Sequence, residues 1–143
     1  MQFRKRVVER SEAQDMMTEI SKDCTLLLIE DNDVVRNMLR DMLESSGYTV
    51  IEAVDGEDGI HAFKNNLHCI ELIISDVLMP KKNGKQVYDA VRSIKEDVKI
   101  LFMSGYSVDV LDNSILEDGR SDFIRKPLRP VELFTKIDGM LAM

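Results

Sequence analysis

The sequence predicts a three-layer α/β sandwich, in which helices cover both faces of a five-stranded parallel sheet. From residue 24 onward, short apolar runs rich in β-branched residues alternate with longer segments whose apolar residues recur every three or four positions. Successive runs end at positions 29, 53, 75, 103 and 124, a spacing that fits one strand and one helix per unit. The runs are apolar on both faces, which is typical of parallel strands joined by right-handed crossovers.

Each apolar run predicts one strand, and each segment that follows a run predicts one helix. The strands are expected at 24–29, 48–53, 70–75, 98–103 and 121–124. The helices are expected at 32–46, about 56–66, 84–95, 107–116 and from Pro130 onward, with that proline in the first turn.

The first helix, 32–46, has the clearest pattern. Its inward stripe comprises Val35, Met38, Leu39, Met42 and Leu43. Arg36, Arg40 and Asp41 fall on the other side and are expected to face water, and Gly47 is expected to end the helix.

The other helices carry thinner apolar stripes. In the second helix, Asp55 and Asp58 resemble a capping box. The expected inward residues of the four helices are Ile60, Phe63 and Leu67; Val87, Val91 and Ile94; Val108, Leu111 and Ile115; and Leu133, Phe134, Ile137 and Leu141.

Charge and hydropathy exclude several classes of function. The net charge is −7, and no basic stripe is available to neutralise phosphates, so direct binding of nucleic acid is not expected. The longest apolar run, 26–29, is far too short to span a bilayer. The basic residues near the N-terminus are followed by only two apolar residues, which excludes a signal peptide and predicts a cytoplasmic protein.

Residues 1–23 are expected to form an N-terminal extension or linker, because their apolar residues are too sparse for a convincing stripe. Cys24 and Cys69 each lie beside an apolar run, so both are expected to be reduced, buried and structural. His61 and His68 have no partner at ligand spacing and are expected to be exposed helix residues.

Polar residues follow four of the five predicted strands. They are Glu30 and Asp31, Asp76, Ser104, and Lys126. Carboxyl ends of parallel strands meet at one edge of the sheet, where ligands bind in this architecture. Three carboxylates about 4 Å apart would repel by roughly 4 kcal/mol per pair at an effective dielectric near 20. A fold that keeps such a cluster therefore needs a cation there.

Oxygen ligands without histidine or thiolate select a hard ion, and carboxylates with water suit Mg²⁺. A carboxylate, a hydroxyl and a lysine beside Mg²⁺ are typical of phosphoryl transfer, in which the metal and Lys126 neutralise phosphoryl oxygens and Ser104 donates a hydrogen bond. The acceptor of the phosphoryl group would be Asp76.

Four motifs in this order resemble the receiver domain of two-component response regulators. They are Leu27-Leu28-Ile29-Glu30-Asp31, Asp76-Val77-Leu78-Met79-Pro80 followed by Gly84, Phe102-Met103-Ser104-Gly105, and Phe123-Ile124-Arg125-Lys126-Pro127. The resemblance covers residues 24–143. It implies a flavodoxin-like sheet in the order 2-1-3-4-5.

The resemblance also implies roles for these residues. Asp76 would be the phosphoacceptor, Asp31 a direct Mg²⁺ ligand, Glu30 an acidic partner acting through water, and the Leu78 backbone carbonyl a further ligand. Ser104, Phe123 and Lys126 match the family's switch hydroxyl, switch aromatic and lysine, and the Lys126-Pro127 bond is expected to be cis.

Three positions depart from the family pattern. Glu30 stands where aspartate is commonest, Arg120 replaces a small residue after Gly119, and Phe123 lacks the hydroxyl of the more frequent tyrosine. In this family, Leu78 and Tyr106 would flank the phosphoryl group, and neither is expected to position an attacking water well.

Two other functions compete with phosphorylation-dependent signal reception. Asp31-Asn32-Asp33-Val34 resembles the opening of haloacid-dehalogenase-type phosphatases, but these need a later acidic pair, and mostly the final helix follows Lys126. A pseudo-receiver that only binds partners is the other alternative.

The resemblance implies a histidine kinase or histidine phosphotransfer protein as phosphodonor. No output module follows residue 143, so the domain is expected either to signal by non-covalent contact with an unknown partner or to belong to a larger hybrid kinase.

Overall fold

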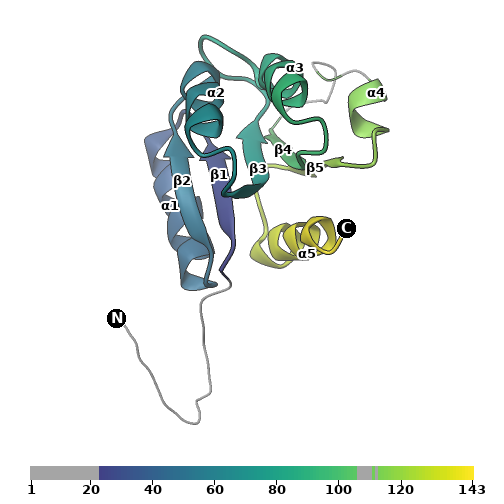
Figure 1. Ribbon diagram of the computed structural model, residues 1–143. Helices are drawn as coiled ribbons and strands as arrows, with labels where there is room; N and C mark the ends of the chain where they lie inside the picture. Colours follow the sequence, from purple (N-terminus) through teal and green to yellow (C-terminus); the bar gives the residue numbers. More distant parts are fainter. Residues whose placement is uncertain (1–22, 106–110, 112) are drawn as a thin grey trace.

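The computed structural model describes residues 23–105, 111 and 113–143, and it contains a five-stranded parallel sheet in the order β2-β1-β3-β4-β5 (Figure 1). The strands are β1 (Thr25–Ile29), β2 (Thr49–Ala53), β3 (Ile70–Asp76), β4 (Ile100–Ser104) and β5 (Ser121–Arg125). The helices are α1 (Asp33–Ser45), α2 (Gly56–Asn65), α3 (Gly84–Ile94), α4 (Asn113–Leu116) and α5 (Pro130–Leu141). The predicted class and strand order are confirmed.

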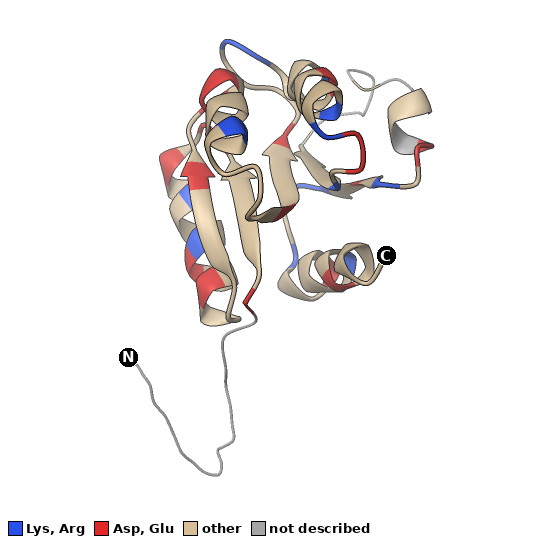
Figure 2. Cartoon of the chain, viewed as in Figure 1, with Lys and Arg blue, Asp and Glu red and all other residues tan. Residues whose placement is uncertain are grey.

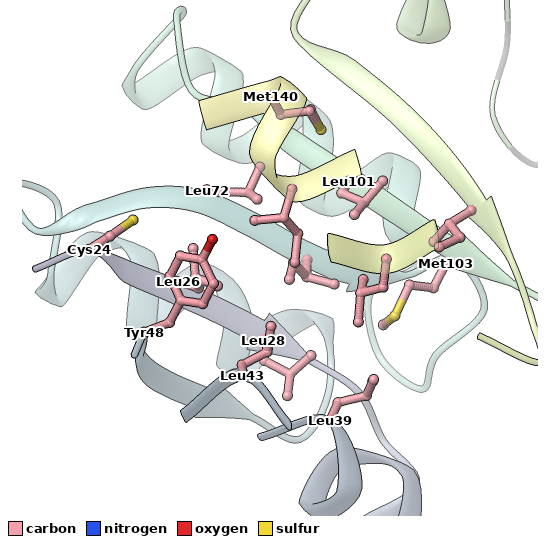
Figure 3. Packing of buried hydrophobic residues seen from close by; sticks show 14 residues of the cluster. Cys24, Leu26, Leu28, Leu39, Leu43, Tyr48, Leu72, Leu101, Met103 and Met140 are labelled. Carbon is pink, nitrogen blue, oxygen red and sulfur yellow. The ribbon is translucent and has the colours of Figure 1, made fainter. Parts of the chain in front are cut away.

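Two apolar cores lie on opposite faces of the sheet, because successive residues of each strand point to opposite sides. One core joins the sheet to α1 and α5, with Leu43 and Ile137 among its fully buried members. Figure 3 shows this core, with Leu26, Leu28, Leu72 and other strand residues packed toward the helices. The second core joins the sheet to α2, α3 and α4.

Side-chain caps begin three of the helices. Asn32 accepts from the Val35 backbone N–H at the start of α1, and Asp55 accepts from the Asp58 N–H at the start of α2. The capping box expected at α2 is wrong in one bond, because the Asp58 carboxylate accepts from the N–H of Val54, one residue before the cap. A complete capping box instead joins Asn83 and Gln86 at α3.

The helix surfaces differ from the predicted pattern at four positions. The Met38 and Ile94 side chains, expected to be buried, are exposed. Arg36 and Arg40, expected in water, are partly buried side chains that both bond to Glu52 of β2. The helical wheel predicts only a direction from the helix, and here a strand supplies a carboxylate on that side.

The segment before β5 can be compared with the predicted helix only over its described residues, where Leu111 lies in a bend. Within the described residues, α4 covers 113–116 rather than the expected 107–116. Residues 106–110 and 112, including the expected stripe residue Val108, lie outside the described residues. Leu111 and Ile115 are buried in the second core, as expected.

Cys24 and Cys69 are both free thiols. Cys24 is buried, but the prediction of a buried Cys69 is wrong, because its side chain is exposed in the turn before β3. His61 and His68 are exposed, but His68 lies in that same turn and not in a helix. No helix in the described part of the chain is long and apolar enough to cross a membrane.

Candidate functional site

Four strand ends bring the predicted site residues together at the carboxyl edge of the sheet. Glu30 directly follows β1, Asp76 is the last residue of β3, and Ser104 is the last residue of β4. Lys126 directly follows β5. The arrowhead end of β3 is acidic in Figure 2. Parallel pairing carries these residues, up to 96 positions apart, to one place.

Lys126 links the two buried carboxylates of this edge. Its Nζ lies 2.7 Å from Glu30 Oε1 and 3.1 Å from Asp76 Oδ2. Glu30 is 1% exposed and Asp76 is 8% exposed, whereas the Lys126 side chain remains partly accessible. One ammonium is therefore shared by two buried carboxylates, because buried charges need a partner of opposite sign.

The third carboxylate, Asp31, lies beside this pair on the turn between β1 and α1. Oxygen atoms of Glu30, Asp31 and Asp76 all lie within 4.8 Å of one another. At an effective dielectric near 20, two negative charges at such a distance repel by about 3–4 kcal/mol. Lys126 cannot neutralise all three carboxylates, so the edge retains excess negative charge.

The pKa values of Asp31 and Lys126 shift accordingly. Burial raises the pKa of Asp31, and the hydrogen bond and charge of Glu30 raise it further, against the opposing effects of the backbone and Lys126. Burial would lower the pKa of Lys126, but its hydrogen bond to Glu30 and the charges of Asp76 and Glu30 outweigh burial and raise that pKa. Lys126 is therefore firmly protonated.

Asp76 is held by its own loop. The Val77 backbone N–H donates to Asp76 Oδ1 at 2.9 Å, and the Ser75 hydroxyl donates to the Asp76 carbonyl. Gly84 packs against this loop, because a Cβ at that position would lie 3.0 Å from Val77 Cα and 3.1 Å from the Asp76 carbonyl oxygen. The start of α3 thus supports the acceptor residue directly.

Ser104 and Phe123 lie on the β4 and β5 side of the site. Ser104 is buried, and its carbonyl accepts from the Lys126 N–H at 2.8 Å, which joins the ends of the two strands. Phe123 is partly buried against the second core. The Lys126-Pro127 peptide bond is cis, as the resemblance implies.

The three carboxylates offer oxygen ligands for a hard cation, with neither histidine nor cysteine in the group. This donor set fits Mg²⁺. Leu78, whose carbonyl would be a further ligand, has a 46% exposed side chain in the loop after Asp76. Tyr106 lies outside the described residues.

Sequence reasoning missed two residues that hold the acidic turn, the segment between β1 and α1 that carries Glu30 and Asp31. The Asn32 N–H donates to Glu30 Oε2 at 3.0 Å, and Arg36 Nη1 donates to the Glu30 carbonyl at 2.9 Å. The capping position of Asn32 before a helix could have been identified from the sequence. The contact of Arg36 depends on how α1 lies over β1.

Comparisons with known proteins agree with this geometry. Residues 26–138 match the response regulator receiver domain family. The chain is 31% identical over 135 residues to the sensor kinase CckA of Brucella abortus, a match that covers 94% of this chain and 14% of that protein. It is 34% identical over 117 residues to the aerobic respiration control protein ArcA of Escherichia coli, which covers 82% of this chain and 48% of that protein.

A solved structure, the receiver domain from the hybrid histidine kinase CckA, superposes with a TM-score of 0.70 at 30% identity. The match covers 82% of this chain and 98% of that one. The chain spans at most about half the length of the two curated relatives.

Proposed function

The chain belongs to the response regulator receiver domain family, and we propose that it accepts a phosphoryl group on Asp76 in a Mg²⁺-dependent reaction. The donor would be a phosphohistidine of a histidine kinase or of a histidine phosphotransfer protein. The observation that carries this proposal is the pair of buried carboxylates, Glu30 and Asp76, bridged by Lys126 with Asp31 beside them.

The transfer forms a bond between an Asp76 carboxylate oxygen and phosphorus while the bond from phosphorus to the donor nitrogen breaks. The electron pair of the broken bond stays on the imidazole nitrogen. A ring protonated on its other nitrogen leaves as neutral imidazole, and a ring that is not protonated takes a proton from solvent as it leaves. Glu30, Asp31, Asp76 and the Leu78 carbonyl would hold Mg²⁺, which supplies charge neutralisation for the phosphoryl oxygens. Lys126 supplies a second positive charge, and Ser104 supplies a hydrogen-bond donor.

Phosphorylation would be read out through Ser104 and Phe123. A phosphoryl group on Asp76 would attract the Ser104 hydroxyl, and Phe123 would then fill the space that the hydroxyl leaves. Support comes from the position of both residues on adjacent strands, with Ser104 buried and Phe123 only partly buried. The surface of α4, β5 and α5 would change as a result.

Several other features belong to the same proposal. The receiver domain would comprise residues 24–143, with residues 1–23 as an extension or linker, and the start of β1 at Thr25 supports that boundary. The protein would act in the cytoplasm as a phosphoacceptor, not as an enzyme with substrate turnover, apart from its own phosphorylation and dephosphorylation.

Incubation with acetyl phosphate and Mg²⁺, followed by intact mass measurement, tests this proposal. We expect wild type to gain one hydroxylamine-labile phosphoryl group, and Asp76→Asn to gain none. Asp89→Asn provides the matched control, because Asp89 is an exposed aspartate of α3 that pairs with Lys85 on the same helix. Removal of Mg²⁺ with a chelator should abolish labelling.

The outcomes separate the proposal from its alternatives. Sustained hydrolysis of a phosphate ester, lost in Asp31→Asn, would indicate a phosphatase of the haloacid-dehalogenase type. A wild-type protein that stays unmodified in the presence of Mg²⁺ would indicate a pseudo-receiver. Labelling that persists in Asp76→Asn would contradict the assignment of the acceptor.

A further inference from the structure

Arg36 contacts three acceptors from three elements around the acidic turn. Its Nη1 donates to the Glu30 carbonyl at 2.9 Å, its Nη2 to Asp33 at 2.7 Å, and its Nε to Glu52 at 3.3 Å. These acceptors belong to the residue that follows β1, to the first turn of α1 and to β2. The Arg36 side chain is only 11% exposed. It therefore joins the turn to the strand beside it.

The turn that Arg36 holds carries two of the three carboxylates. Glu30 is fixed at its N–H by the Ala53 carbonyl, and at its side chain by the Asn32 N–H and Lys126. Arg36 fixes the remaining backbone group, the Glu30 carbonyl. The peptide that begins at this carbonyl leads directly to Asp31. A rotation of that peptide would move the Asp31 carboxylate relative to Glu30 and Asp76.

From these contacts we propose that Arg36 is a positioning residue for the cation-binding carboxylates Glu30 and Asp31, an inference that rests on the proposed function. Arginine is needed because its planar guanidinium presents donors in a fixed fork, which one lysine ammonium cannot reproduce across three acceptors. Partners of metal ligands commonly alter metal affinity by 10–100-fold when they are replaced.

The direction in which Mg²⁺ affinity changes in Arg36 variants distinguishes a positioning role from a simple electrostatic one. Arg36 is a cation near a site for a divalent cation, so loss of its charge alone would increase Mg²⁺ affinity. Loss of positioning would decrease that affinity. Arg36→Lys retains the charge and loses the fork, and should therefore resemble Arg36→Gln.

Arg40 provides a matched control one helical turn away. It bonds to the other oxygen of the same Glu52, at 3.2 Å, and to Asn37 and Asp41. Within the described residues, none of these bonds reaches Glu30 or Asp31. Figure 2 shows acidic and basic segments in close succession along α1, where this network lies.

The experiment measures Mg²⁺ affinity by calorimetric titration of the full chain as wild type, Arg36→Gln, Arg36→Lys and Arg40→Gln. We expect both Arg36 variants to bind Mg²⁺ about tenfold more weakly, and Arg40→Gln to stay within about twofold of wild type. With acetyl phosphate, the Mg²⁺ concentration for half-maximal labelling should rise by the same factor. The rate at saturating Mg²⁺ should change less than about twofold, whereas a general structural defect would lower it.

Equal or tighter Mg²⁺ binding in the Arg36 variants would overturn this inference and leave the proposed function standing. Full wild-type affinity in Arg36→Lys would also overturn it, because the guanidinium fork would then not be needed to position the carboxylates. A wild-type chain that binds no Mg²⁺ would overturn the proposed function together with the inference.

Discussion

Two polar clusters lie at opposite edges of the same sheet and differ in how completely their carboxylates are neutralised. The carboxyl-edge site consists of Glu30, Asp31, Asp76 and Lys126. The Asp118 cluster, at the start of β5, consists of Tyr88, Arg92, Asp118 and Ser121. In the first, three carboxylates share one lysine. In the second, one carboxylate has several donors.

Asp118 accepts from the Tyr88 hydroxyl at 2.7 Å, from Arg92 at 2.6 Å and from the Ser121 hydroxyl at 3.3 Å. Its other oxygen accepts from the Arg120 N–H at 2.7 Å. Arg92 also lies over the Tyr88 ring, 4.9 Å from the centroid, and donates to the Val98 carbonyl. These contacts tie α3 to the turn before β5.

The pKa values of Asp118 and Asp31 shift in opposite directions, which reflects how completely each carboxylate is neutralised. Burial alone would raise the pKa of Asp118, but hydrogen bonds from Tyr88, Arg120 and Arg92 outweigh it and lower that pKa. The pKa of Asp31 is raised, by burial first and then by Glu30. A carboxylate whose ionised form the fold stabilises has a structural role. A carboxylate whose ionised form the fold destabilises is suited to bind a cation or to accept a phosphoryl group.

The largest effect is expected from Lys126→Met, which leaves two buried carboxylates without their cation. We expect the free energy of unfolding in chelator at pH 7 to fall by about 2–4 kcal/mol, because one partner of a buried ion pair is lost. Mg²⁺ should restore more stability to this variant than to wild type, since it replaces the missing charge. Urea unfolding with and without Mg²⁺ measures both quantities, and equal gains in the two proteins would contradict the account.

Asp118→Asn should reduce the free energy of unfolding by about 1.5–3 kcal/mol, because hydrogen bonds to a charged acceptor are lost. The loss should be the same with and without Mg²⁺. A lowered folded-state pKa stabilises the fold at pH values above the ordinary pKa of 3.8. The difference between variant and wild type should therefore be full at pH 7 and shrink as the pH falls below 3.8. A stability loss that changes with Mg²⁺ would instead link the Asp118 cluster to the carboxyl-edge site.

Tyr88→Phe removes one hydrogen-bond donor from Asp118 and should lower the free energy of unfolding by about 1 kcal/mol. The double variant with Asp118→Asn should lose less free energy of unfolding than the sum of the losses in the two single variants, because both single variants remove the same hydrogen bond. Urea unfolding of the four proteins in the cycle gives this coupling, and strict additivity would show that the bond contributes nothing.

Leu78→Asn replaces an exposed residue beside the carboxyl-edge site, and we expect it to have the smallest effect of these variants. An amide that positions water beside phosphorylated Asp76 should shorten the lifetime of the phosphoprotein severalfold, which corresponds to about 1 kcal/mol in the barrier. Loss of the phosphoryl group over time after removal of donor measures this. An unchanged lifetime, or decay of the wild-type phosphoprotein within seconds, would show that Leu78 does not control hydrolysis.

The sequence predicts the carboxyl-edge site well because its residues directly follow apolar runs. Asp76 and Lys126 could be assigned to one edge once the parallel sheet was inferred, since topology brings strand ends together. The strand bounds agree to within two residues. Both features depend on local patterns that a single chain displays.

The Asp118 cluster could not be predicted in this way. Tyr88 and Arg92 lie 30 and 26 positions from Asp118, and no local pattern connects them. Arg36 was expected in water for the same reason, because the helical wheel does not include Glu52 of β2. Polar networks between elements require the packed arrangement before their partners can be named.

The most direct test of the contrast between the two edges is the stability of Asp31→Asn, measured by thermal unfolding at pH 7 in chelator and in Mg²⁺. Because a raised folded-state pKa makes the anion costly above it, removal of the charge should raise the melting temperature in chelator by about 1–3 °C, after discounting for the solvent exposure of Asp31. The gain should disappear below pH 3.8, where the carboxyl is protonated in both states. Mg²⁺ should stabilise the variant less than wild type. A lower melting temperature in chelator, together with equal stabilisation by Mg²⁺, would contradict the claim that the carboxyl edge carries unneutralised charge reserved for a cation.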